Sequence, residues 1–192
     1  MERVHPGLAQ AVNPQAAAPI VNRRIRPPSV CRLPDERTGY YRRTGVPFTL
    51  DIFGLAGSAT TDLGIGQVWE DFASQADVVL PMVYPSHYRR GSYGIAHPNA
   101  QPYATVKRAL EDAIQRSRGM ADPATIRPYL QSFSIFRVRY TAAEVREQIR
   151  ASEDLGLSDW VLWNSSGNYP AAAFRRTAGG RPPVVASGMD RN

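Results

Sequence analysis

The chain has 192 residues, with 23 lysine and arginine residues against 17 acidic residues and a net charge of +6 at pH 7. The basic excess lies at the two ends, because residues 1–46 carry a net charge of +5 and residues 171–192 carry +3, whereas residues 47–170 carry −2. A nucleic-acid surface would place basic residues on the folded part of the chain, so nucleic acid is not a predicted partner.

The remaining composition bears on disulfides, membrane spans, metals and cofactors. Cys31 is the single cysteine, which rules out a disulfide within the chain. No apolar stretch approaches the roughly 20 residues of a membrane helix, and the first residues do not resemble a signal peptide, so the localisation of a parent protein is left open. Three scattered histidines and the absence of glycine-rich nucleotide motifs predict neither a metal nor a cofactor.

The two ends of the chain show no regular hydrophobic period. Residues 1–45 are rich in arginine and proline and are predicted to form a disordered or irregular arm. Residues 171–192 are rich in alanine, glycine, proline and arginine and are predicted to form a flexible tail.

Between these ends, β-type apolar runs alternate with helical stretches. The predicted strands are 48–53, 78–84, 126–133 and 160–164, although Pro81 inside the second run requires a bulge or a local strand end. The first predicted helix is 65–76, with Ile65, Val68, Trp69 and Phe72 on one side. The second is 102–118, and the third begins at the capping box of Thr141 and Glu144 and ends at Gly156. This alternation predicts an α/β fold of about four parallel βα units over residues 46–170, which is half of a (β/α)8 barrel.

Sites in parallel α/β folds form at the carboxyl ends of the strands. The polar and aromatic residues predicted to lie there are Asp51, Tyr84, His87, Tyr88, Gln131, Trp163 and Asn164. Aromatic faces stack on the apolar faces of sugars, and amides bind their hydroxyl groups, so this set suits a carbohydrate.

These residue types also have ordinary structural interpretations. Asp51 could cap a helix or pair with an arginine, His87 could be a hydrogen-bonded loop histidine, and Tyr84 and Trp163 could fill a barrel interior. Gln131 is polar in an apolar strand, and because a buried amide needs partners, a pocket position is favoured for it.

Several segments together resemble a known family, the bacterial family of putative glycosyl hydrolase domains, which is a largely uncharacterised TIM-barrel family. The segments are Val79-Leu80-Pro81-Met82-Val83-Tyr84-Pro85-Ser86-His87-Tyr88, Arg127-Pro128-Tyr129-Leu130-Gln131, Trp160-Val161-Leu162-Trp163-Asn164 and, upstream, Asp51-Ile52-Phe53-Gly54. The resemblance covers about residues 46–170 and places the four strands as strands five to eight of a (β/α)8 barrel. It implies a carbohydrate substrate, Asp51 as a catalytic carboxylate and the other six site residues as substrate-binding.

One part of the family pattern is absent. The family's fourth strand carries an Asp-Tyr-x-Arg-Phe-Pro motif, which nothing in residues 1–45 matches. Because glycoside hydrolysis normally uses two carboxylates, the first hypothesis is a truncated glycoside hydrolase with little or no activity alone. The alternatives are a non-catalytic polysaccharide-binding module and a non-functional remnant, and open barrel edges additionally predict self-association.

Overall fold

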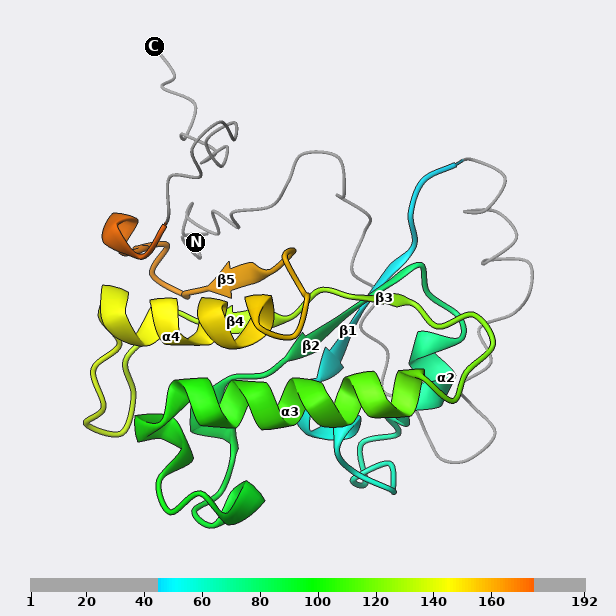
Figure 1. The fold of residues 1–192 in the computed structure, drawn as a ribbon, viewed down its shortest axis with the longest axis horizontal. Coiled ribbons are helices and arrows are strands. Elements are labelled where there is room, and N and C mark those ends of the chain that lie inside the picture. The colour runs from blue at the N-terminus through cyan, green and yellow to red at the C-terminus, as the bar shows by residue number, and fades with distance from the viewer. Residues whose placement is uncertain (1–44, 175–192) are drawn as a thin grey trace, which may run out of the picture.

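The computed structural model describes residues 45–174 as a single α/β unit (Figure 1). The predicted arm over residues 1–45, apart from its last residue, lies outside the described residues. The same holds for the predicted tail from residue 175 onward, so neither expectation is tested.

The sheet is wholly parallel and does not close on itself. Its strands are β1 (Thr49–Phe53), β2 (Val78–Met82), β3 (Thr125–Ile126), β4 (Tyr129–Gln131) and β5 (Val161–Trp163). They are arranged in the order β1-β2-β4-β5, with β3 also paired to β2, so that β1 and β5 form the two edges. The predicted α/β class with a parallel sheet is confirmed.

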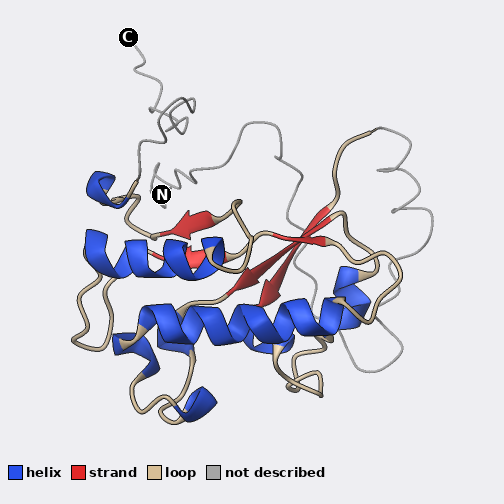
Figure 2. Ribbon diagram, in the orientation of Figure 1, coloured by secondary structure: helices blue, strands red, loops and turns tan. Residues whose placement is uncertain are grey.

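The helices are α2 (Trp69–Ala73), α3 (Pro102–Ser117) and α4 (Ala142–Glu153). Figure 2 shows α3 and α4 side by side, forming a layer against the strands. The capping box predicted at the start of α4 is present, because the Thr141 hydroxyl accepts from the Ala143 amide at 3.2 Å and the Glu144 carboxylate accepts from the Thr141 amide at 2.7 Å. After β5 the described residues contain only the 3₁₀ turn Ala171–Ala173.

Alternation along the strands gives the sheet two different faces. One face packs against the helices in what we call the helix-side core, whose members include Ile52, Trp69, Phe72, Val79, Val83, Leu110, Leu130, Val145 and Leu162. The opposite face, which we call the inner face, carries a second buried cluster of Leu80, Tyr84, Tyr129 and Val161, with Trp163 packed beside it. In a barrel this second face lines the interior.

The first predicted helix is shorter than expected. It begins at Trp69 rather than at residue 65, and Ile65 is 44% exposed instead of facing inward. Gly64 and Gly66 have φ values of +71° and +72°, which a right-handed helix does not allow, so the chain stays in a loop until Val68.

The third predicted strand is divided in two around Pro128. Pro128 has no amide hydrogen to donate to a ladder, and it lies between β3 and β4. On this side β2 pairs with β3 at Val79 and next with β4 at Met82, so no strand residue is paired with Pro81 there. Pro81 can therefore stand inside β2 although it has no amide hydrogen to donate. The local interruption expected at Pro81 is therefore on the neighbouring strand rather than in β2 itself.

Candidate active site

Asp51 lies on the inner face. Its neighbours Leu50 and Ile52 pack toward the helix-side core, so strand alternation directs Asp51 to the other side, in register with Leu80. Among residues 45–174 its carboxylate has no hydrogen bond or ion pair, and it caps no helix. Burial raises the pKa of this carboxyl group.

Two tyrosines flank this carboxylate. Burial, and after it the negative charge of Asp51, raises the pKa of Tyr129 to about 12. Burial is also the main cause of the strongly raised pKa of Tyr84, and the charges of Tyr129 and Asp51 add to it. Tyr84 and Tyr129 share the inner-face cluster, and the charge of Asp51 raises the pKa of both, so the three groups lie near one another.

His87 extends the cluster at the end of the sheet. Its ring stacks on Phe53, with centroids 5.4 Å apart and planes 9° apart, and meets Tyr84 edge-on at 5.1 Å. Tyr84 in turn meets Phe133 edge-on at 5.6 Å. Burial lowers the pKa of His87, which favours its neutral imidazole. The four rings form a continuous row, which we call the aromatic row, beside Asp51.

Gln131 has a different environment from the one expected. It is fully buried, and its side-chain oxygen accepts from the Ser86 amide at 3.1 Å, while its side-chain nitrogen donates to the Phe133 carbonyl at 2.9 Å and to Asn99 Oδ1 at 3.4 Å. The partners that a buried amide requires are therefore all protein atoms. Gln131 holds the segment that carries His87, and its direct contact with a sugar stays a prediction.

The last three predicted site residues are divided between two regions. Trp163 packs against the inner-face cluster. Tyr88 is buried in the helix-side core instead, with its ring centroid 5.5 Å from that of Tyr93, so the fold does not bring it to Asp51. Asn164 shapes the turn after β5 by donating to the Ser132 and Asn168 carbonyls at 2.6 and 2.7 Å. Sugar contacts by Tyr88 and Asn164 stay predictions.

Two residues of this region were not singled out from the sequence. Tyr129 stands two positions before Gln131 and Phe133 two positions after it, and the inner-face cluster includes Tyr129 with Phe133 packed against it. Strand parity within the run Tyr129-Leu130-Gln131 was the signal that could have identified Tyr129.

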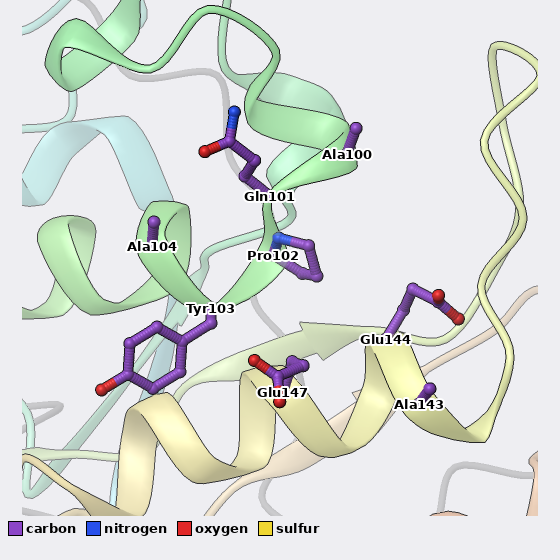
Figure 3. Close-up of a pocket in the computed structure, with 8 residues that line it drawn as sticks. All are labelled: Ala100, Gln101, Pro102, Tyr103, Ala104, Ala143, Glu144 and Glu147. Atoms are coloured by element: carbon purple, nitrogen blue, oxygen red, sulfur yellow. The ribbon is translucent and has the colours of Figure 1, made fainter.

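A separate pocket of about 380 Å³ lies between the first turns of α3 and α4 (Figure 3). Figure 3 shows Glu144 and Glu147 on α4 and Tyr103 on α3. The Glu144 carboxylate is engaged in the capping box, and Glu147 pairs with Arg150 at 2.8 Å. This pocket belongs to the helix layer, and its two acids serve α4, so the inner face is the better candidate for catalysis.

Two further observations concern residues 45–174 only. No group of three His, Cys, Asp or Glu side chains in this range is placed to hold a metal ion. No helix in the described part of the chain is both long enough and apolar enough to cross a membrane.

Comparison with known families matches residues 37–169 to the family described as "Putative glycosyl hydrolase domain". The chain belongs to this family. The resemblance that the sequence motifs indicated is thereby confirmed, and a match to a glycosyl hydrolase family agrees with an inner face that carries a carboxylate beside aromatic rings.

None of the curated proteins matches the chain. One similar solved structure is that of the PgaB (BpsB) glycoside hydrolase domain from Bordetella bronchiseptica, with 20% sequence identity and a TM-score of 0.49. The similarity covers 70% of this chain and 36% of that one, so this chain spans about a third of the length of the solved domain.

Proposed function

We propose that this chain carries part of the active site of a glycoside hydrolase, with Asp51 as a catalytic carboxylate. The observation that supports this most directly is the state of Asp51, a partly buried carboxyl group with a raised pKa and no partner from residues 45–174. Burying a carboxylate without a partner costs free energy, and such groups concentrate at functional sites. A raised pKa also suits a general acid, which must hold a proton near neutral pH.

The aromatic row supplies the complementary surface for a sugar. His87 is the exposed member of the row next to Asp51, Tyr84 is buried behind it against Phe133, and Trp163 lies on the same face. Rings of this kind stack on the apolar faces of sugars, which supports a carbohydrate as the substrate.

We further propose that the 192-residue chain alone has little or no hydrolytic activity. Glycoside hydrolysis normally needs two carboxylates about 5–10 Å apart. Burial raises the pKa of Asp51, and no carboxylate of the described residues contributes to that shift. This supports a partner carboxylate from outside residues 45–174.

An NMR titration of the Asp51 carboxyl group tests the acid role without requiring activity. The expected result is a pKa above the ordinary aspartate value of about 3.9. The matched control is Asp122, an exposed aspartate in the loop before β3, at the opposite end of the strands. A pKa for Asp51 at or below the ordinary value would refute the role of general acid.

Activity measurements on a panel of glycosides test the second claim. No rate above background is expected for the wild-type chain. A rate that is lost in Asp51→Asn but kept in Asp122→Asn would overturn the claim of inactivity and support Asp51 as a catalytic group.

The alternative function is a polysaccharide-binding module without catalysis, and the aromatic row is the observation that favours it. Under this alternative, Tyr84→Ala and Trp163→Ala abolish retention on polysaccharide, whereas Asp51→Asn leaves retention unchanged. Self-association through the edge strands β1 and β5 also stays a proposal, and sedimentation velocity at increasing protein concentration tests it. A monomer at every concentration would contradict it.

A further inference from the structure

A second concave region adjoins the aromatic row. A pocket of about 570 Å³ lies at the carboxyl ends of β4 and β5 and is lined by residues 132–134, Tyr140, residues 164–166 and residues 168–170. Its volume falls within the roughly 300–1,000 Å³ of small-molecule sites. Its position corresponds to the end of the sheet where sites form in parallel α/β folds.

The pocket is continuous with the surroundings of Asp51. Phe133 lines the pocket and meets Tyr84 edge-on at 5.6 Å. Tyr169 also lines it and is close enough to raise the pKa values of both Tyr84 and Tyr129, the two tyrosines that flank Asp51. A polymer bound at Asp51 would therefore reach this pocket with an adjacent unit.

The walls of the pocket are held in place by bonds within the protein. The Asn164 side-chain amide donates to the Ser132 carbonyl after β4 and to the Asn168 carbonyl of its own turn, and its oxygen accepts from the Ser166 amide at 3.0 Å. Elsewhere in the lining, the Ser134 hydroxyl accepts from the Tyr140 amide at 2.9 Å, and the Tyr140 hydroxyl donates to the Asn99 carbonyl at 3.0 Å. These bonds fix the shape of the pocket before any ligand enters.

Among residues 45–174, every residue that lines this pocket is uncharged. A carboxylate or ammonium group that entered would lose water without meeting an opposite charge, which is unfavourable. The lining instead offers neutral polar groups, including the exposed Asn168 and Ser165. Ser132 adds a buried hydroxyl that has no hydrogen-bond partner among the described residues.

We propose that this pocket is a subsite for an uncharged sugar unit, so that the chain recognises a neutral or N-acetylated glycan rather than a polyuronate or a glycan with free amines. The inference rests on the proposed function, because it assigns a class of substrate to the same site. It adds residues 132–134, 164–166 and 168–170 to the sugar-binding surface beside the aromatic row.

The test is binding of the full chain to immobilised glycans in three groups. These are neutral glycans (glucans, xylans, mannans, galactans and N-acetylglucosamine oligomers), polyuronates (polygalacturonate and alginate), and chitosan. Retention on at least one neutral glycan, with at least tenfold weaker retention on the two charged groups, is the expected result. Stronger retention on a charged group, or no retention on any neutral glycan, would overturn the proposal.

Two variants connect this binding to the pocket. Asn168→Ala removes a side chain with no role in the turn, since only its backbone carbonyl is bonded to Asn164, and at least tenfold weaker retention is expected. Tyr169→Ala should weaken retention similarly. The control is Phe136→Ala, which removes an aromatic ring that is 74% exposed outside the pocket and should leave retention unchanged. Unchanged retention in both pocket variants would refute the subsite.

The outcomes for the subsite and for the catalytic role are separable. An ordinary pKa for Asp51 together with neutral-glycan retention that depends on Asn168 would reject the catalytic role and keep the subsite. A raised Asp51 pKa together with stronger retention on polyuronate would keep the catalytic role and reject the subsite for a neutral sugar.

Discussion

Replacing Gln148 by methionine removes the side-chain amide that pairs with the buried peptide groups of Gln131. The Gln148 side-chain oxygen accepts from the Gln131 amide at 2.9 Å, and its nitrogen donates to the Gln131 carbonyl at 2.7 Å. Both residues are fully buried. The peptide groups of successive residues in β4 point alternately toward the two neighbouring strands. The Tyr129 carbonyl accepts from the Val83 amide on the β2 side, and the Ser132 amide donates to the Trp163 carbonyl of β5. The peptide groups of Gln131 therefore point toward the β2 side.

The strand β2 ends at Met82, before it reaches the level of Gln131, and Gln148 takes the place of the missing strand. Each buried peptide group left without a partner costs about 1–3 kcal/mol, and about 1 kcal/mol of the total is offset by the more apolar methionine. The expected loss in the free energy of unfolding is therefore about 1–5 kcal/mol, with about 3 kcal/mol as the central value.

Urea unfolding followed by tryptophan fluorescence measures this loss. The matched control is Gln115→Met on the exposed side of α3, for which a change below about 0.5 kcal/mol is expected. If Gln148→Met were within about 0.5 kcal/mol of the wild type, the reasoning that these buried peptide groups depend on Gln148 would be refuted.

Three further predictions follow from the described contacts. Burial raises the folded-state pKa of Asp51, so its ionisation destabilises the folded protein above about pH 4 but not near pH 3. Asp51→Asn should therefore have a higher melting temperature than the wild type at pH 7 and the same melting temperature at pH 3. A difference in melting temperature that does not change with pH would contradict this. Thr141→Ala removes the capping box with Glu144 and should lower the free energy of unfolding in urea by about 0.5–2 kcal/mol. An unchanged free energy of unfolding would show that the capping box does not stabilise the protein. Trp69→Phe removes a fully buried indole N–H that donates to the Ser117 hydroxyl at 3.0 Å. Calorimetry should show a loss of about 1–3 kcal/mol in the free energy of unfolding, and an unchanged melting temperature would contradict this.

Part of the candidate site could be predicted because its signals are local. Asp51, Tyr84 and His87 each stand at or just after a recognisable apolar run, and the parallel topology brings such ends together. Tyr88 and Gln131 have the same sequence signature, but the structure turns their side chains into the protein. The direction of a loop side chain depends on its packing partners, which are distant in sequence.

The sequence by itself determined the α/β class, the family, the extent of α3 and the capped start of α4. These depend on hydrophobic periods, on Pro102 at the start of α3 and on the pair Thr141 and Glu144, all of which act over a few neighbouring residues. Only the tertiary structure decided that β3 and β4 are separate, that Ile65 is exposed, and that Asp51 lies among tyrosines without a partner from the described residues. Those outcomes depend on contacts between segments that are far apart along the chain, and the local pattern carries no record of them.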